Sequence, residues 1–210
     1  MLGIGHRSGY EPHNRTHHHL DRRTIDILNE CLLCTPLMPG PCYLEGNIVD
    51  LHVIDEEDLP FLQALVNDPE VWSWLNHLGP VTMEAEESWY DEIAHASDQE
   101  HLIVCVGNEA VGIIGMSDID ADWGVAEIGY FIDPDARENG YASAAVGLLT
   151  EYAFETRRLM KLQAYVLEKN EPSQRVLEKN EYECEGRLRK QAFRCGRRED
   201  VLVYGRLAGA

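Results

Sequence analysis

The sequence predicts an α/β fold of the mixed α+β kind with one central sheet, and three observations lead to this expectation. Apolar runs of strand length alternate with longer segments of helical period along most of the chain. A tight-turn signal, Gly107-Asn108, separates two strand-like runs in the middle, and a long hairpin-like segment ends the sequence. Strands and helices in this order are typical of one sheet covered by helices.

The first half of this fold is expected to contain one strand and several helices. Residues 49–54 have the pattern of a strand, and Asp55 is placed to cap a helix with an acidic first turn. That helix is expected to end at residues 67–69, and a second helical region follows through 71–75. Thr82 precedes a stretch in which apolar residues recur at helical spacing, so a further helix is expected there.

The second half alternates strands with helices, and a polar loop is expected at Asp118–Gly124. Each strand is an apolar run bounded by turn residues, and Pro172 suits the first turn of a short helix. The expected strands are His101–Val106, Ala110–Met116, Val125–Ile132, Lys161–Leu167, Tyr182–Arg194 and Asp200–Leu207, and the long helix is Ala142–Arg157.

Residues 1–37 differ in composition from the rest of the chain. They contain four Arg and four acidic residues, so the formal charge of -19 lies in the remainder. Five of the nine His also fall here, and prolines with a glycine interrupt the chain at 36–41. We expect a loose N-terminal arm at 1–37, either an appendage or an upstream extension outside the working protein, and one domain at 38–210.

The charge of the chain excludes several classes of partner. There are 18 Lys and Arg against 37 Asp and Glu, and a surface this negative repels nucleic acid and anionic lipid. No apolar run is long enough to span a membrane, and no apolar signal sequence begins the chain, so a cytoplasmic location is expected. Only four of the basic residues are Lys. Such surfaces are typical of proteins from salt-loving microbes; an acidic face that attracts a cationic substrate is the alternative.

The six cysteines are expected to be reduced thiols, since no export signal accompanies them. The C-x-x-C pair, Cys31 and Cys34, lies near His17, His18 and His19, so zinc binding is one interpretation. A second ligand pair on a folded scaffold is missing from this segment, and no metal is therefore expected.

The segment most informative about chemistry is Glu127–Ala142, E-I-G-Y-F-I-D-P-D-A-R-E-N-G-Y-A. Its last part, 137–142, joins a strand to a helix, and the first turn of a helix presents unpaired backbone N–H groups and a positive dipole end. Gly140 allows the backbone to approach a phosphate closely, and Arg137 is able to add charge-assisted hydrogen bonds. The motif predicts an anion site; an ordinary strand–helix turn is the alternative.

This arrangement resembles the acyl-CoA signature of the GNAT superfamily of N-acetyltransferases, whose loop reads Arg or Gln, x, x, Gly, x, Gly or Ala. The resemblance covers residues 43–207 and includes N-D-P-E-V-W at Asn67–Trp72. Two runs, N-E-P-S at Asn170–Ser173 and E-G-x-L-R at Glu185–Arg189, resemble the branch that contains the ribosomal-protein N-terminal alanine acetyltransferases. The family implies a central splayed, mostly antiparallel sheet, acetyl-CoA as co-substrate and no metal.

The resemblance also assigns residues to the co-substrate. It implies that the strands at 125–132 and 161–167 diverge and leave a cleft for the pantetheine arm of acetyl-CoA. Backbone groups of Phe131 and Ile132 would bind this arm, with Asn170 beside it. The loop that would hold the pyrophosphate consists of Arg137, Glu138, Asn139, Gly140, Tyr141 and Ala142.

Acetyl transfer to an amine requires a base, because an alkyl ammonium has a pKa of about 10 and only the neutral amine attacks. Glu127 is the candidate base, since it lies on the strand beside the expected acetyl group, where partial burial would raise its pKa. A solvent-facing glutamate is the alternative. Ser173 is the candidate acid that protonates the leaving thiolate, and a helix-start residue that caps N–H groups is the alternative for it.

The chain departs from the family pattern at one catalytic position. Many GNAT enzymes carry a tyrosine about one turn after this serine, where the chain has Val176 and Leu177. A phenol elsewhere in the cleft would then have to act as the acid. The candidates for this replacement are Tyr130, Tyr141 and Tyr165.

The expected activity is transfer of an acetyl group from acetyl-CoA to an amine, without a covalent enzyme intermediate. The acceptor is an N-terminal amine of a protein if the branch resemblance holds, and otherwise a small amine such as a polyamine, an antibiotic or a metabolite. A non-catalytic acyl-CoA-binding module is the rival from another class. The protein is expected to be a monomer or homodimer, and Trp123 is a candidate contact for the acceptor.

Overall fold

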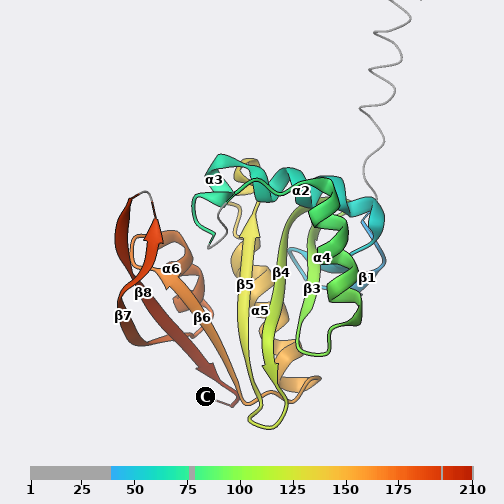
Figure 1. Cartoon of the computed structure of the whole chain (residues 1–210). Coiled ribbons are helices and arrows are strands. Elements are labelled where there is room, and N and C mark those ends of the chain that lie inside the picture. Colours follow the sequence, from blue (N-terminus) through green and yellow to red (C-terminus); the bar gives the residue numbers. More distant parts are fainter. Residues whose placement is uncertain (1–38, 76–78, 195, 210) are drawn as a thin grey trace, which may run out of the picture. The chain divides into compact units, whose positions relative to one another are not determined.

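The computed structural model describes residues 39–75, 79–194 and 196–209. In this part of the chain an eight-stranded sheet has the order β1-β2-β3-β4-β5-β6-β8-β7 (Figure 1). All neighbouring strands are antiparallel except β5 and β6, which are parallel. The arm predicted at 1–37 lies outside the described residues. The strands are β1 (Cys42–Leu44), β2 (Asp50–Val53), β3 (Glu100–Val106), β4 (Glu109–Asp120), β5 (Val125–Ile132), β6 (Lys161–Leu167), β7 (Glu183–Arg194) and β8 (Arg197–Leu207); the helical elements are η1 (Glu56–Asp58), α2 (Leu59–Asn67), α3 (Pro69–Trp72), α4 (Met83–His95), η2 (Pro134–Ala136), α5 (Tyr141–Glu155) and α6 (Glu171–Lys179).

Element bounds agree with the sequence-based prediction along β5 and β6 and differ most at β4. Thr82 caps α4 as predicted, because its hydroxyl oxygen accepts a hydrogen bond from the N–H of Ala85 at 3.2 Å. β4 continues to Asp120, so the loop predicted from Asp118 onward is wrong in its first residues. The register shifts there and Asp118 has a φ of 49°, which allows pairing to resume at Asp120 after an irregular turn of backbone.

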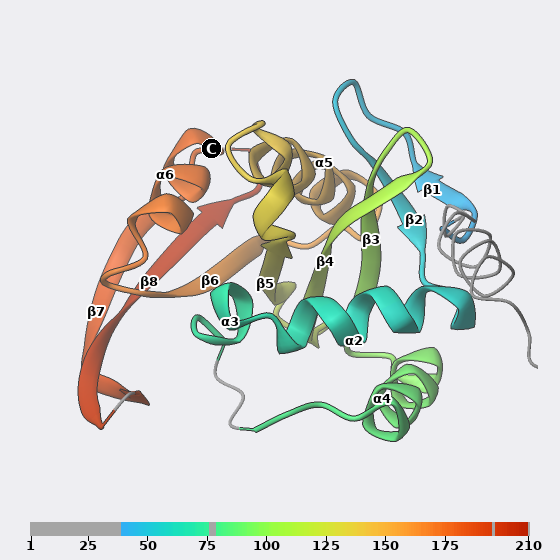
Figure 2. The same ribbon diagram turned by 90° about the horizontal axis from the view of Figure 1, so that it is seen from above.

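Helices cover both faces of the sheet, with α5 on one side and α2 and α4 on the other (Figure 2). Side chains alternate across each strand, so β3 contributes to two separate cores. Leu102 and Val104 pack in the core that includes α5, whereas Ile103 and Cys105 pack with residues of α2 and α4. The sheet is therefore buried on both faces in its centre, and side chains of either face can reach a gap between its strands.

Such a gap separates β5 from β6. Pairing between these strands begins at Val125 with Lys161 and ends at Glu127 with Gln163, so it spans three residue pairs. Beyond this point the strands diverge (Figure 1). β5 remains bonded to β4, and β6 to β8, so each strand leaves one edge of its backbone facing the gap. This is the splayed sheet that the sequence predicts.

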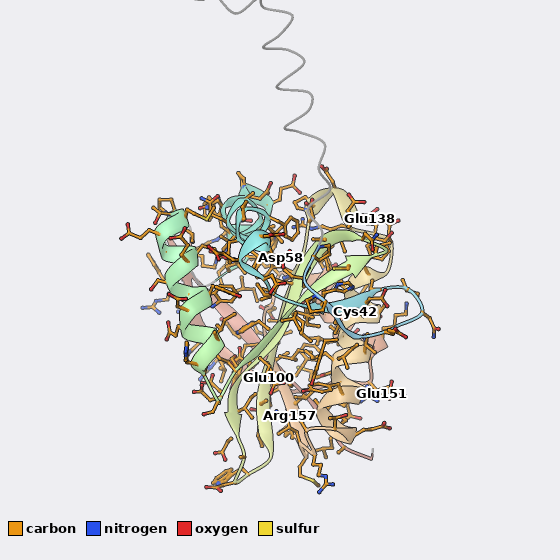
Figure 3. The ribbon with its side chains drawn as sticks, turned by 90° about the vertical axis from the view of Figure 1, so that its right-hand side faces the viewer. Cys42, Asp58, Glu100, Glu138, Glu151 and Arg157 are labelled. Atoms are coloured by element: carbon orange, nitrogen blue, oxygen red, sulfur yellow. The ribbon has the colours of Figure 1, made fainter. Side chains whose placement is uncertain are left out.

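Asp58, at the start of α2, anchors the segment that leads into β1 (Figure 3). Its carboxylate is fully buried, and Oδ2 accepts hydrogen bonds from the N–H groups of Asp55 at 2.9 Å and Gly40 at 3.4 Å. Nδ1 of His52 donates to the carbonyl oxygen of Gly40 at 2.6 Å. Burial raises the pKa of Asp58, and the two N–H bonds oppose that rise. A residue predicted only as part of an acidic helix start is thus an internal support.

Gly115 and Gly129, which pair across β4 and β5, provide a matched test of packing on the sheet. A Cβ at Gly115 would collide with the ring of His101 and lie 2.6 Å from the carbonyl oxygen of Glu100, whereas a Cβ at Gly129 meets nothing within 4 Å. We expect Gly115→Ala to lower the free energy of unfolding by about 1–3 kcal/mol, because overpacking displaces the backbone. Gly129→Ala should change it by less than about 0.5 kcal/mol. Urea unfolding measures both; equal stabilities would show that the contact at Gly115 relaxes without cost.

Candidate active site

A continuous cleft of about 1370 Å³ follows the gap between β5 and β6. β4 and β5 form its floor; α4 and the segment before it form one wall, and the start of α5, β6 and α6 form the other. This volume exceeds the range of about 300–1,000 Å³ that holds a drug-sized ligand, so the cleft suits a larger one. The predicted site residues that line it are Glu127, Phe131, Ile132, Arg137, Glu138, Gly140, Tyr141, Ala142, Asn170 and Ser173.

Asn139 is the predicted site residue that does not line the cleft. Its Nδ2 group donates hydrogen bonds to the carbonyl oxygens of Ala136 at 3.2 Å and Arg137 at 3.1 Å, so its side chain braces the turn before α5. Gly140 is the N-cap of α5, with a φ of 82° that glycine adopts without strain. No side chain caps the helix, and its first N–H groups are therefore available to an anion in the cleft.

Arg137 is held by α3. Its Nη1 lies 3.4 Å from Oε2 of Glu70, Nη2 donates to the carbonyl oxygen of Glu70 at 3.1 Å, and Nε donates to the carbonyl oxygen of Ile132 at 3.3 Å. These bonds fasten the loop before α5 to a helix that lies 67 residues away in the sequence. The sequence identified Arg137 as a cation near the anion site but carried no signal for this partner.

Glu127 lies on the face of β5 that α2 and α4 cover. Glu127, Gly129 and Phe131 alternate along the strand and so share this face, and Glu127 stands opposite Ser117 of β4. Burial raises the pKa of Glu127, and the charge of Asp118 raises it further. A half-buried carboxyl group with a raised pKa on the wall of a cleft is suited to accept a proton near neutral pH.

Tyr130 and Ser173 approach the gap from the opposite face of the sheet. Tyr130 packs against the core that includes α5, and its hydroxyl shares a hydrogen bond of 2.9 Å with Oγ of Ser173. Burial raises the pKa of Tyr130 far above its usual range, and the bond to Ser173 opposes that rise. The cap of α6 is Asn170, whose Oδ1 accepts from the N–H of Ser173 at 3.3 Å. The capping role considered for Ser173 therefore belongs to Asn170.

The sequence prediction missed the part of the lining contributed by α4 and the segment before it. Trp89, predicted to pack in the core, both contacts the core beneath α4 and lines the cleft. Its ring lies 5.4 Å from that of His101, edge to face. Trp123, predicted as an acceptor contact, is 79% exposed and lies outside the lining. We call this region the α4 end of the cleft, defined by Trp74, Val81, Ala85, Glu86, Trp89 and His101.

The β7–β8 hairpin reaches the α4 end from across the gap. The guanidinium carbon of Arg194 lies 5.9 Å from the centre of the Trp74 ring. A cation–π contact of this kind is worth about 0.5–2 kcal/mol. It joins the hairpin to the segment that follows α3, so the two arms of the split sheet also meet at the mouth of the cleft.

Charged residues divide the cleft into two regions. The cations of the lining, Arg137, Arg175 and Lys179, lie at the start of α5 and on α6. The carboxylates Glu86 and Glu127 lie at the α4 end and on the floor. The positive region coincides with the uncapped start of α5, which is consistent with an anionic ligand there and a cationic one at the opposite end.

The structure offers no separate metal site among the residues that it describes. In these ranges no three His, Cys, Asp or Glu residues gather in a way that could hold an ion. Cys42, Cys105 and Cys184 are free thiols, and the pair Cys31 and Cys34 lies outside the described residues. Within the same ranges, none of the helices has the length and apolar character needed to cross a membrane.

Comparison with known proteins identifies relatives along most of the chain. The family model "Acetyltransferase (GNAT) domain" matches residues 49–183. An uncharacterized N-acetyltransferase, p20 of Bacillus licheniformis, is 30% identical over 163 residues, which cover 75% of this chain and 91% of that protein. Spermidine N-acetyltransferase from Vibrio cholerae, solved with CoA and spermine, superposes with a TM-score of 0.73 at 22% identity over 76% of this chain and 95% of that one. RimL, a ribosomal L7/L12 alpha-N-protein acetyltransferase solved with coenzyme A, gives 0.72 at 20% identity over 77% and 95%. At these identities the two structures show the fold alone.

The raised pKa of Glu127 predicts a pH-dependent difference in stability. Above the folded pKa the charged carboxylate disfavours the folded state, and below the unfolded value of 4.5 the neutral side chain does not. We expect Glu127→Gln to unfold at a higher temperature than the parent protein at pH 7 and at the same temperature near pH 4. Glu109→Gln, in the exposed turn between β3 and β4, is the matched control for loss of one charge. Circular dichroism melts at both pH values measure the difference, and identical behaviour of the two variants would contradict a raised pKa.

Proposed function

The chain belongs to the GNAT acetyltransferase family, and from that membership we propose that it acetylates a cationic primary amine by direct attack on acetyl-CoA, with Glu127 as the general base. Its class, an acetyl-CoA-dependent N-acetyltransferase, follows from the family. The opening between β5 and β6 carries the proposal. One end of this opening reaches the uncapped start of α5, and Glu127 lies half-buried on its floor.

For the pyrophosphate of acetyl-CoA we propose the start of α5 as the binding site. Gly140, Tyr141 and Ala142 line the cleft at this point, and the N–H groups and dipole of a long helix stabilise an anion there. Arg137 and Glu138 border the same loop. The bonds from Arg137 to Glu70 hold the loop in place, and the guanidinium is near enough to add positive potential.

For the pantetheine arm we propose the free edge of β5. Backbone groups of Phe131 and Ile132 lie where β5 has lost its pairing with β6, and an extended amide-containing arm pairs with such an edge as an added strand does. Asn170 lines the opposite wall while its Oδ1 caps α6. The arm would therefore lie in the gap with the thioester close to Glu127.

Acetyl-CoA supplies the acetyl group as a thioester. The acceptor arrives as an ammonium ion, and Glu127 takes its proton, directly or through a water molecule. The neutral nitrogen then attacks the carbonyl carbon, a C–N bond forms, and the C–S bond breaks to release the CoA thiolate. Burial brings the pKa of Glu127 closer to neutrality, which makes its carboxylate a more effective base than a solvated one.

The leaving thiolate requires a proton donor, and we assign this role to Ser173 with Tyr130 behind it. The raised pKa of Tyr130 keeps its phenol protonated, so this hydroxyl can donate to Oγ of Ser173 while Ser173 donates to sulfur. Tyr130 thereby takes the place of the tyrosine that the family carries one turn further along α6. The two faces of β5 would then serve opposite steps, with the base on one and the acid on the other.

The acceptor classes that remain are the N-terminal amine of a protein and a small amine. RimL acts on the N-terminus of a ribosomal protein and the Vibrio enzyme acetylates spermidine, so relatives of this fold represent both classes. The carboxylates at the α4 end and on the floor suit either, because both acceptors are cations in water.

A panel of acceptors tests the proposed function. We expect thiol release from acetyl-CoA only when a peptide or a small amine of one class is present, with mass spectrometry identifying the acetylated product. The reaction without acceptor and the reaction with N-acetylated versions of the same compounds are the controls. Tight binding of acetyl-CoA without transfer to either class would favour the non-catalytic acyl-CoA-binding module instead.

Glu127 and Asp118 together predict the pH dependence of the reaction. We expect Glu127→Gln to lower kcat/KM by about 100- to 10,000-fold, as is typical for loss of a general base, while the affinity for acetyl-CoA stays within about twofold. Asp118→Asn removes a like charge and should move the acidic limb of the kcat/KM profile to lower pH, since it lowers the pKa of Glu127. Asparagine tolerates the positive φ of this position.

Steady-state rates between about pH 5 and pH 9 measure both effects. Glu109→Gln should leave the profile unchanged, because this residue lies in an exposed turn. An unaltered rate in Glu127→Gln would remove Glu127 from the mechanism.

A further inference from the structure

Glu86 is the one residue of α4 that the structure buries, and it is a carboxylate. Its exposed fraction is 7%, whereas the other acidic residues of the helix, Glu84, Glu87, Asp91 and Glu92, are exposed. A helix that covers a sheet normally buries apolar side chains on that face. The inward position of Glu86 therefore asks for a polar or charged partner.

No described residue provides that partner. Glu86 makes no side-chain hydrogen bond or ion pair with any of them, and burial is the cause that raises its pKa. Asp58, the other carboxylate buried to this degree, accepts N–H groups from Asp55 and Gly40. A buried carboxylate that lacks such bonds destabilises the free protein, and a cation that reaches it would remove this cost.

The place of Glu86 in the cleft indicates where its partner comes from. The residue lines the α4 end, three positions before Trp89, so the two side chains are neighbours on one face of the helix. Trp89 contacts His101, which lies over Gly115, and the floor continues from there through Gly129 to Glu127. Glu86 and Glu127 thus border the same space from the wall and from the floor.

The charges that face this space leave it anionic. Burial lowers the pKa of His101, so the ring is neutral near pH 7, and the Glu70 carboxylate is paired with Arg137. Arg175 and Lys179 belong to α6, on the opposite wall. Lys and Arg are absent from the described lining at the α4 end. A ligand that enters there meets carboxylates and aromatic rings, a combination that favours ammonium groups.

We propose that Glu86 binds a second cationic group of the acceptor, so that the preferred acceptor is a diamine or a longer amine with one positive charge besides the reacting nitrogen. This inference rests on the proposed function and divides the work between two carboxylates. Glu127 takes a proton from the reacting amine, and Glu86 keeps its charge and holds the group that does not react. A monoamine fills only the first position, and an amino acid of the same length places a carboxylate against Glu86.

The test compares acceptors of equal length at fixed acetyl-CoA: 1,n-diaminoalkanes, n-alkylamines and ω-amino acids. We expect kcat/KM to favour the best diamine over its matched monoamine by about 10- to 100-fold, the range of a charge-assisted bond, and the amino acid to be poorest. Glu86→Gln keeps the shape of the side chain and should bring diamine and monoamine within about threefold, with the monoamine rate little changed. Glu87→Gln, the exposed neighbour, is the matched control and should retain the preference.

Two further measurements separate failure of this inference from failure of the proposed function. Calorimetric binding of the diamines without acetyl-CoA should weaken in Glu86→Gln and not in Glu87→Gln, whether or not any acetyl group is transferred. The free Glu86→Gln protein should also unfold at a higher temperature at pH 7, because a buried charge is gone. Equal rates and equal binding of diamines and monoamines by the parent protein would overturn the role of Glu86, as would a preference that survives in Glu86→Gln. Specific diamine binding without transfer would support Glu86 and contradict the proposed reaction.

Discussion

β5 and β6 share three residue pairs before they part, and the backbone groups that they no longer offer each other have to be satisfied in another way. Each strand is still bonded on its outer side, β5 to β4 and β6 to β8, so the sheet remains intact while a wedge of free edge opens within it. Water or a ligand with amide groups can fill that wedge. The cleft, the position of the α5 start and the access of Glu127 and Ser173 to one space all follow from this single interruption of pairing.

The order of elements was predictable because it is written in local patterns. The bounds of β5 and β6, the cap at Thr82 and the proline in the first turn of α6 depend on residues close together in the sequence. The error at Asp118 has a physical reason as well. Polar residues with turn character can remain in a strand when a register shift absorbs the irregular backbone, and pairing with a distant strand decides the outcome.

The site was predictable as a set of positions and unpredictable as a set of contacts. A motif located the loop at 137–142, yet the bond from Arg137 to Glu70 depends on how α3 packs beside that loop. The pairing of Tyr130 with Ser173 likewise joins β5 to α6 across the gap. Glu86 was hidden for another reason: in an acidic helix, the spacing of carboxylates gives no sign of which one points inward. Long-range packing supplied all three.

The contact between Arg194 and Trp74 gives the split sheet a hinge with a weak latch. At the base, the arm of β6, β8 and β7 is joined to β5 by paired backbone, and behind it α5 packs against α6. At the mouth, a contact worth about 0.5–2 kcal/mol breaks easily at room temperature. Widening of the mouth then separates two side chains without disturbing sheet hydrogen bonds. The departure of a bulky thiol product is thereby uncoupled from the stability of the fold, and the residence time of that product becomes a property of one arginine.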